Sequence, residues 1–267
     1  MASNITNWFV NGKICIVTGS NTGIGKTAAQ ELVRRGAKKV ILACRNVEKA
    51  EEARQDIIKN TCCKEDQVQV RQIDLSSIKS VRKFAAEVNN QEPEVHVLVN
   101  NAGLFGSEKR SLSVDGNEMC FATNHLGHFL LTNLLLDKLK QSAPSRIVNV
   151  AAHKVAFWLS RPGFHIDDVN FDKPGAYSAV QAYSQTKLAN VLFTRELHRR
   201  LQENGANQVT TYSLFPGVIK TEIDRGLGRF WKTMFNWFGT TAENGAKTTV
   251  YCASQPGIEN LSGKYFS

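Results

Sequence analysis

Tyr183 and Lys187 are the residues with the clearest chemical potential, because they lie four positions apart in the stretch YSQTK. On a helix, this spacing places a phenol and an ammonium group on one face. A neighbouring cation stabilises a phenolate, so we expect Lys187 to lower the pKa of Tyr183 from its reference value of about 10. Tyr183 could then exchange a proton with a substrate oxygen. The same spacing also occurs on ordinary amphipathic helix surfaces, so the interpretation depends on the surrounding motifs.

A glycine-rich turn, TGSNTGIG, follows the first apolar run of the chain and leads directly into a stretch of helical periodicity. Glycines permit a tight turn and a close approach of backbone to a ligand, and a helix N-terminus presents free N–H groups to phosphates. We therefore expect a dinucleotide pyrophosphate here, with a purely structural turn as the alternative. The residues expected to contact it are Gly19, Ser20, Asn21, Thr22, Gly23, Ile24 and Gly25.

The residue that follows the second apolar run bears on which dinucleotide binds. An acidic residue there would bind the ribose 2′-hydroxyl of NAD, whereas this chain has Arg45 in the stretch ACRN. A guanidinium pairs well with a 2′-phosphate, so we predict NADP(H), with a solvent-facing arginine as the alternative. Asp74 and Leu75 follow the third apolar run. The Asp74 carboxylate could accept a hydrogen bond from the adenine amino group, cap the next helix, or do both.

These motifs need a scaffold, and the chain predicts one through apolar, β-rich runs that alternate with helical stretches. Runs such as ICIVT and VILAC are continuous, which indicates strands covered on both faces. We expect strands at 13–18, 39–44, 68–73, 95–99, 146–150 and 209–215, and helices at 24–36, 47–60, 78–88, about 124–139 and about 183–201. The fold class is therefore α/β: a Rossmann-type, doubly wound parallel sheet with helices on both faces, in a single domain spanning 1–267.

Two long segments, 153–180 and 218–240, interrupt this alternation after strand ends. Ligands of open α/β sheets bind outside the carboxyl ends of the strands, so we expect both segments to form substrate walls. The aromatic residues of the second favour a lid over a large apolar substrate, ahead of contact with a lipid interface or simple core packing. The candidate substrate residues are Ala152, His153, Phe230, Trp231 and Met234.

The composition limits the class of partner. The net charge is +9, but Lys and Arg form no long run and no recognition motif accompanies them, so we predict no nucleic-acid partner. The six cysteines show no zinc-ligand spacing, which predicts free thiols, a reducing compartment and no metal. Residues 1–10 contain no apolar run long enough for a signal peptide or a membrane span. We expect a cytoplasmic protein, with peripheral contact with an intracellular membrane as an alternative.

In this order, the motifs resemble those of the short-chain dehydrogenase/reductase family. The resemblance rests on the glycine turn, NNAG at 100–103, Asn124 in NHLGHF, Tyr183 with Lys187, and Pro216-Gly217 with Thr221. Segments such as ACRN, KLANVLFTRELHRRL and LSGKYFS look like the retinol-dehydrogenase branch. This likeness implies an NADP(H)-dependent oxidoreductase that interconverts a lipophilic alcohol and its aldehyde or ketone, with hydride moving to or from the nicotinamide.

The resemblance also implies roles for individual residues. Lys187 would hold the nicotinamide ribose, Tyr183 would lie beside it, and Asn124 would connect the lysine to solvent through water. A homodimer formed through the long fourth and fifth helices is plausible by the same likeness, although members of this branch can be monomeric. The further cofactor contacts implied are Asn101, Ala102, Gly103, Pro216, Gly217, Val218 and Thr221.

One position departs from the family pattern. Where that pattern has Asn-Val-Ser-Ser, with the second serine bonded to the substrate oxygen, this chain has Asn-Val-Ala151-Ala152. Loss of one such donor costs about 10²- to 10³-fold in rate. Three explanations stay open: His153, Ser160 or Ser178 replaces the donor; the site performs isomerisation or cyclisation; or the protein is a nucleotide-binding pseudoenzyme. We expect a working oxidoreductase because the Tyr183 and Lys187 pair is intact.

Overall fold

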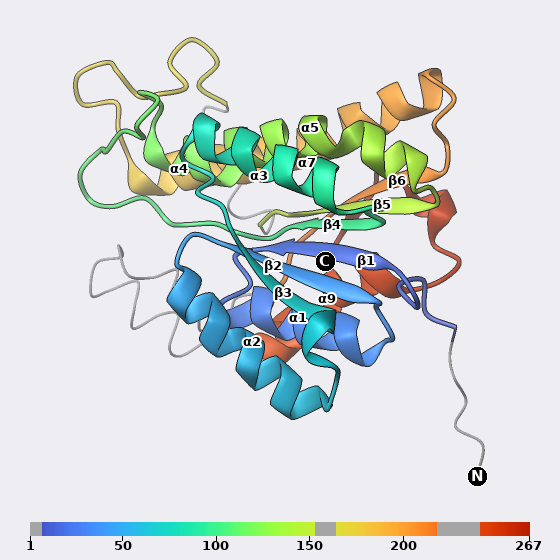
Figure 1. The fold of residues 1–267 in the computed structure, drawn as a ribbon. Helices are drawn as coiled ribbons and strands as arrows, with labels where there is room; N and C mark the ends of the chain where they lie inside the picture. The colour runs from blue at the N-terminus through green and yellow to red at the C-terminus, as the bar shows by residue number, and fades with distance from the viewer. Residues whose placement is uncertain (1–6, 153–163, 218–240) are drawn as a thin grey trace.

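The computed structural model describes residues 7–152, 164–217 and 241–267, and its centre is a parallel β-sheet (Figure 1). Seven strands lie in the order β3-β2-β1-β4-β5-β6-β7, and every neighbouring pair is parallel. The predicted doubly wound Rossmann-type sheet is therefore confirmed. The strands are β1 (Ile14–Thr18), β2 (Lys39–Cys44), β3 (Val68–Gln72), β4 (Val97–Asn100), β5 (Ser145–Val150), β6 (Val209–Leu214) and β7 (Tyr265–Phe266).

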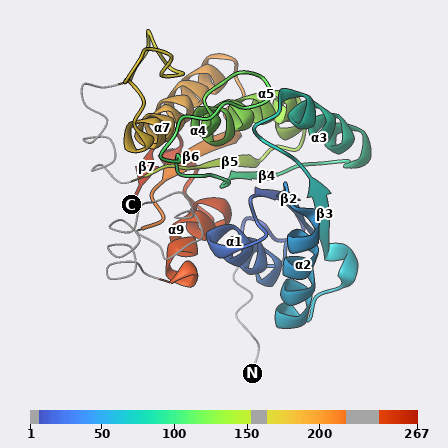
Figure 2. The ribbon, with the colours of Figure 1, turned by 90° about the vertical axis from the view of Figure 1, so that its left-hand side faces the viewer.

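Helices cover both faces of this sheet, as Figures 1 and 2 show. One face carries α1 (Gly23–Arg34), α2 (Val47–Thr61) and α9 (Ala242–Ser254), and the other carries α3 (Ile78–Gln91), α5 (Gly127–Gln141) and α7 (Ala179–Glu203). Before α5, the chain forms the short α4 (Met119–Phe121) and the π-helical turn η2 (Ala122–Leu126). Two 3₁₀ turns, η1 (Glu65–Gln67) and η4 (Glu259–Leu261), complete the described helical elements.

The continuous apolar runs are explained by two cores, one on each side of the sheet. In β1, Cys15 and Val17 pack into the core beneath α1 and α9, while Ile14 and Ile16 pack into the core beneath α3 and α5. Successive residues of a strand point to opposite faces, so a strand buried on both faces needs apolar residues at every position. All five residues of β1 are buried.

The chain order of the strands creates the crevice where a ligand can bind. β1 pairs with β2 on one side and with β4 on the other. The strands up to β3 are therefore added on one side of β1, and the strands from β4 onward are added on the other side. The turn that begins with Gly19 and the loop that begins with Asn101 therefore leave adjacent strands in opposite directions. In open α/β sheets, this topological switch point is the usual ligand site.

The elements differ from the sequence prediction at several boundaries. α7 begins at Ala179 rather than near Tyr183, so Tyr183 lies one turn inside the helix. The helix expected near Asn124 is preceded by α4 and the π-helical turn. α9 and β7 were not predicted. α9 contains Asn244-Gly245, a pair typical of turns, and the side chain of Thr241 caps it by accepting a hydrogen bond from the Asn244 N–H.

Three further findings concern the described residues alone. All six cysteines are free thiols, and four of them are buried. Within 7–152, 164–217 and 241–267, no group of three or more His, Cys, Asp or Glu side chains is placed to hold a metal ion. No helix in these ranges combines the length and apolar character needed to cross a membrane.

Candidate active site

A cavity of about 500 Å³ opens at the carboxyl ends of β1, β2, β3 and β4. Its walls are the segments that directly follow these strands, which is where the sequence analysis placed the cofactor. Of the predicted contact residues, the following line this cavity: Gly19, Asn21, Thr22, Gly23, Ile24, Gly25, Arg45, Asp74, Leu75, Asn101, Ala102 and Gly103.

The glycine turn is compact in a way that larger side chains would prevent. Gly19 and Gly23 have φ angles of 63° and 56°, a left-handed conformation that favours glycine. A Cβ atom on Gly25 would lie 2.4 Å from the carbonyl oxygen of Gly19, and one on Gly19 would lie 2.8 Å from Cα of Ala102. Thr22, the N-cap residue of α1, makes no side-chain capping bond, so its hydroxyl satisfies none of the free N–H groups at this helix N-terminus.

Ser20 was expected to contact the cofactor, but the structure places its side chain elsewhere. Ser20 is fully buried, and its hydroxyl donates a hydrogen bond to the carbonyl oxygen of Val17 at 2.8 Å. Its Oγ atom also lies 3.6 Å from Sγ of Cys44. The Ser20 side chain therefore ties the turn to the strands beneath it, and it does not line the cavity.

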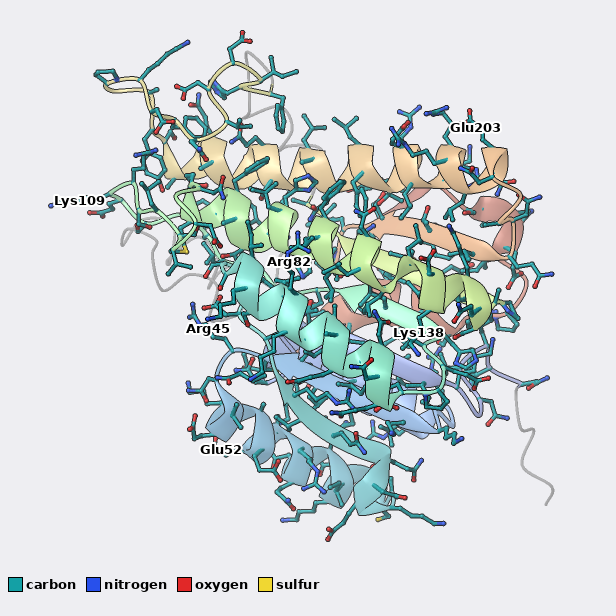
Figure 3. All side chains as sticks on the ribbon, turned by 45° about the horizontal axis from the view of Figure 1, so that its top comes forward. Arg45, Glu52, Arg82, Lys109, Lys138 and Glu203 are labelled. Atoms are coloured by element: carbon teal, nitrogen blue, oxygen red, sulfur yellow. The ribbon has the colours of Figure 1, made fainter. Side chains whose placement is uncertain are left out.

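The turn after β2 and the first turn of α2 each present one cation to the cavity. Arg45 and Lys49 both line it, both are exposed, and neither forms an ion pair with a described carboxylate. The Asn46 side chain accepts a hydrogen bond from the Lys49 N–H at 2.7 Å and so begins α2. Figure 3 shows Arg45 and Lys109 toward one end of the molecule, with Lys138 and Glu203 toward the other.

Asp74 lines the cavity, but it does not cap the next helix, so that alternative was wrong. Its Oδ1 atom accepts hydrogen bonds from the backbone N–H and the hydroxyl of Ser76, at 2.9 and 2.6 Å. The N-cap of α3 is Ser77, whose side chain accepts from the Ser80 N–H. Asp115, from a distant loop, accepts from the N–H of Ile78. The Asp74 carboxylate is thus held by its own turn at the cavity wall.

Thr18 and Asn124 fasten the loop after β4 at two points. The Thr18 hydroxyl oxygen accepts the N–H groups of Asn101 and Ala102 at 2.9 and 3.0 Å. The Asn124 side chain accepts from the Leu104 N–H at 2.8 Å and donates to the Leu104 carbonyl oxygen at 2.9 Å. Asn124 is fully buried, and its amide also donates to the hydroxyl oxygen of Thr186. The wall formed by 101–104 is therefore held by polar contacts from two other elements.

Tyr183 and Lys187 lie on α7, and Lys187 is anchored to the end of β5. The Lys187 Nζ atom donates to the carbonyl oxygen of Val150 at 3.2 Å and lies 5.6 Å from the centroid of the Tyr183 ring. A Cβ atom on Gly103 would lie 3.4 Å from both Lys187 Nζ and Asn124 Oδ1, so these two side chains flank Gly103. Phe105 lines the cavity, and its ring centroid lies 4.8 Å from that of Tyr183.

The expected lowering of the Tyr183 pKa was wrong. Burial of the hydroxyl group raises the pKa of Tyr183, although the ring as a whole keeps some exposure. Burial also lowers the pKa of Lys187 to about 8. Desolvation is the largest cause of both shifts, because both groups lose water and the neutral form of each is then favoured. At neutral pH, the phenol is thus protonated and can donate a proton.

Ala152 follows β5 and is 6 % exposed. Its methyl group offers no hydrogen-bond donor, and its carbonyl oxygen accepts from the Tyr265 hydroxyl at 2.9 Å. Ser178, one of the residues considered as a replacement donor, is the N-cap residue of α7 and makes no side-chain capping bond. Pro216 and Gly217 follow β6 and are not among the described residues that line the cavity.

Some predicted site residues lie outside the described residues. These are His153, Ser160, Val218, Thr221, Phe230, Trp231 and Met234.

Sequence reasoning missed Lys49 and Phe105 as cavity residues, and it assigned no role to His128 and Asn190. A signal existed for two of them. His128 lies four residues after Asn124 and Asn190 three after Lys187, both spacings that place side chains on one helix face. Arg45 precedes α2 and Phe105 lies in a loop, so helix spacing predicts neither Lys49 nor Phe105 as a neighbour of the site.

The sheet is parallel, and its first turn is rich in glycine and lines a cavity at the topological switch point. These features define the dinucleotide-binding class of α/β proteins. Residues 13–156 match the family model described as short chain dehydrogenase. Human retinol dehydrogenase 11 is 48% identical over 96% of this chain and 77% of its own length, and human retinol dehydrogenase 13 is 46% identical over 96% and 76%. The chain therefore belongs to the short chain dehydrogenase family, in its retinol dehydrogenase-like branch.

Solved structures show the same fold. A crystal structure of an uncharacterised protein from Mycobacterium paratuberculosis matches with a TM-score of 0.74 and 37% identity, over 96% of this chain and 80% of that one. A crystal structure of a candidate NAD(P)-dependent gluconate 5-dehydrogenase from Beutenbergia cavernae, with NADP bound at low occupancy, matches with a TM-score of 0.74 and 22% identity, over 96% of this chain and 95% of that one. The second likeness concerns the fold alone.

Proposed function

We propose that this chain is a single-domain, NADP(H)-dependent oxidoreductase that interconverts a lipophilic alcohol and its aldehyde or ketone. The observation that carries the cofactor choice is the pair of cations, Arg45 and Lys49, in the cavity wall after β2. An NAD-specific site would have a carboxylate at this place, and two cations complement a 2′-phosphate instead. The stretch from Ala43 to Asn46 contains no acidic residue.

The glycine turn supports a dinucleotide of either kind. A Cβ atom on Gly19 or Gly25 would collide with backbone atoms, so the turn is built to keep side chains out of the space beside the N-terminus of α1. Backbone N–H groups and the helix dipole at such a terminus stabilise a pyrophosphate. When bound, the dinucleotide supplies or accepts the hydride.

The residues of this chain would then manage the proton. Tyr183, protonated at neutral pH, would donate its proton to the carbonyl oxygen during reduction and take it back during oxidation. Lys187, with its pKa lowered to about 8, is mainly an ammonium group at pH 7 and would hold the cofactor ribose beside the phenol. Asn124 would connect this lysine to solvent through water.

The names of the relatives and the apolar part of the cavity support the proposed substrate class. The relatives are named retinol dehydrogenases, and Leu104 and Phe105 contribute apolar surface next to Tyr183. We therefore propose a retinoid-like or other lipophilic carbonyl substrate, with Phe230, Trp231 and Met234 in its lid. A cytoplasmic location, peripheral membrane contact and a homodimer stay predictions.

The test is an absorbance assay of NADPH and NADH oxidation with retinoid, steroid and aliphatic carbonyl compounds. We expect oxidation with a lipophilic substrate and a clear preference for NADPH. A preference for NADH would contradict the cofactor assignment, and turnover of only small polar carbonyls would contradict the substrate class.

One observation favours a second candidate function. Ala152 provides no hydroxyl group where the family pattern has a serine, so the site could bind NADP(H) and perform a non-redox reaction such as isomerisation or cyclisation, or serve only as a nucleotide-binding pseudoenzyme. Tight NADPH binding without turnover of any carbonyl or alcohol would favour this alternative. The intact Tyr183 and Lys187 pair is the reason for placing it second.

A further inference from the structure

His128 lies on α5, one turn after Asn124, and is 2 % exposed. Its Nε2 atom is 2.9 Å from the hydroxyl oxygen of Thr18, and its Nδ1 atom is 3.1 Å from the backbone carbonyl oxygen of Asn124. A carbonyl oxygen can only accept, so Nδ1 must carry the hydrogen. Nε2 of the neutral ring then accepts the hydrogen of the Thr18 hydroxyl.

The Thr18 side of this arrangement reaches the cofactor cavity. A hydroxyl group has one hydrogen and two lone pairs. Donation to His128 leaves both lone pairs of Thr18 for the N–H groups of Asn101 and Ala102, which lie at 2.9 and 3.0 Å and line the cavity. The other acceptor near the hydroxyl, the carbonyl oxygen of Val99, is 3.4 Å away. His128 thus determines where the Thr18 hydrogen points.

The Asn124 side reaches the catalytic lysine. The backbone oxygen of Asn124 also accepts from the side-chain amide of Asn190 at 3.2 Å. The same amide donates to the carbonyl oxygen of Val150 at 3.3 Å, and this carbonyl accepts from Lys187 Nζ at 3.2 Å. The other side-chain atom of Asn190, Oδ1, lies 2.9 Å from Nδ1 of His125. Asn190 is 4 % exposed, so water does not compete freely for these bonds.

We infer that His128 is a positioning residue that joins the cofactor wall to the catalytic lysine, and this inference rests on the NADP(H)-dependent reaction proposed above. One arm runs through Thr18 to 101–102. The other runs through the Asn124 carbonyl and Asn190 to the carbonyl that anchors Lys187. Each arm has its own ring nitrogen, so the two can be broken separately.

The arrangement requires a neutral ring, and the surroundings keep it neutral. Burial lowers the pKa of His128 to about 3, with smaller contributions from the nearby Lys187 and His125. A protonated ring would present an N–H to Thr18, which would then have to turn its hydrogen toward Val99.

Two substitutions separate the arms. In His128→Asn, the amide can keep a donor near the Nδ1 position but removes the acceptor for Thr18. In His128→Gln, the longer side chain can keep an acceptor near the Nε2 position but removes the donor to Asn124. We expect His128→Asn to raise the Kd for NADPH about tenfold with a smaller effect on kcat, and His128→Gln to lower kcat about tenfold with a smaller effect on Kd.

The NADPH titrations and single-turnover rates are measured together with thermal unfolding. His198→Gln is the matched control, because His198 also makes a side-chain bond, to Ser262 at 3.0 Å, outside this network. Thr18→Val should reproduce the Kd effect of His128→Asn and add little to it in the double variant. If neither His128 variant folds, Thr18→Val and Asn190→Leu test the same two arms.

Equal effects of both variants on Kd and kcat, or no effect beyond a lower unfolding temperature, would overturn the inference and leave a merely structural histidine. If the wild-type protein binds and oxidises NADPH, but the two His128 variants do not affect Kd and kcat differently, this inference alone is overturned. Wild-type protein that takes up no NADPH overturns the proposed function as well.

Discussion

Lys187 places its Nζ atom 5.6 Å from the centroid of the Tyr183 ring while it donates a hydrogen bond to the carbonyl oxygen of Val150. The lysine is therefore positioned by the end of β5 and not by the phenol. Burial raises the pKa of Tyr183 and lowers that of Lys187, so one physical cause favours the neutral form of both groups. A protonated phenol held next to a fixed ammonium group is suited to donating a proton during carbonyl reduction.

Tyr183→Phe should remove the proton donor and little else. We expect the turnover rate to fall by about 10²- to 10⁴-fold, the usual range for a general acid, while the Kd for NADPH stays near that of the wild type. Turnover and NADPH titration are measured on the same preparation, with Tyr251→Phe as the control because Tyr251 lies on α9 with an exposed ring. A retained rate would exclude Tyr183 as the donor.

Arg45→Ala and Lys49→Ala should each weaken NADPH binding about tenfold and leave NADH binding unchanged, because only NADPH carries the 2′-phosphate. Both side chains are exposed, so salt should screen the effect and reduce the difference between variant and wild type. Titrations at low and high ionic strength check this, with Arg82→Ala on α3 as the control (Figure 3). A parallel loss of NADH affinity would mean that these cations do not discriminate between the cofactors.

Ala152→Ser should raise turnover on a lipophilic aldehyde or ketone, by at most about 10²- to 10³-fold, because it restores one donor to the substrate oxygen. Ala151→Ser is the neighbouring control, since both alanines are buried at the end of β5 and only position 152 matches the second serine of the family pattern. No gain in Ala152→Ser would show that the hydroxyl is supplied elsewhere or that the site performs other chemistry.

Gly25→Ala should lower the free energy of unfolding by about 1–3 kcal/mol and weaken NADPH binding, because its Cβ would lie 2.4 Å from Gly19 O and 2.5 Å from Asn101 Nδ2. Gly103→Ala is the comparison on the same cavity, since its nearest contacts are at 3.4 Å. Urea unfolding should show a smaller loss for Gly103→Ala. Equal losses would contradict the steric explanation.

The lowered pKa of His128 should make part of the free energy of unfolding sensitive to acid. Its pKa is about 3 in the folded protein and about 6.5 in the unfolded chain, so the unfolded state binds more protons between these values. The stabilisation is complete above about pH 6.5 and is lost as the pH falls toward 3. His125 and His96 also have lowered pKa values, so the measurement is the difference between wild type and His128→Asn. An unchanged slope of unfolding free energy against pH in the variant would contradict the assignment.

The sheet could be predicted well from the sequence, because a strand buried on both faces consists of consecutive apolar residues. A continuous apolar run such as ICIVT indicates a strand that is buried on both faces. The turn after β1 requires glycine because a Cβ atom on Gly19 or Gly25 would collide with backbone atoms. β7 was missed because two residues, Tyr265 and Phe266, are too few for any pattern. α9 was missed because Asn244 and Gly245 are typical of a turn, and only the cap from Thr241 and packing against α1 favour a helix.

The site was predicted less completely, because burial and long-range contacts have no local signal. Spacing placed Tyr183 and Lys187 on one face, but the direction of the Tyr183 pKa depends on the protein around its hydroxyl. Asp74 was a reasonable cap from sequence, yet Ser77 takes that position. The partners of His128 come from β1 and from the π-helical turn, and nothing in the linear sequence joins Thr18 to a residue 110 positions away.

The strand order separates two properties of the enzyme in space. Arg45 follows β2, whereas Lys187 is anchored to β5, and β1 and β4 lie between these strands. Three inter-strand steps amount to about 14 Å. The β2–α2 turn could therefore exchange one coenzyme for another during evolution or engineering without disturbing the proton-transfer groups. Under the proposed function, the cation that would select the coenzyme and the groups that would transfer the proton belong to different strands of one sheet.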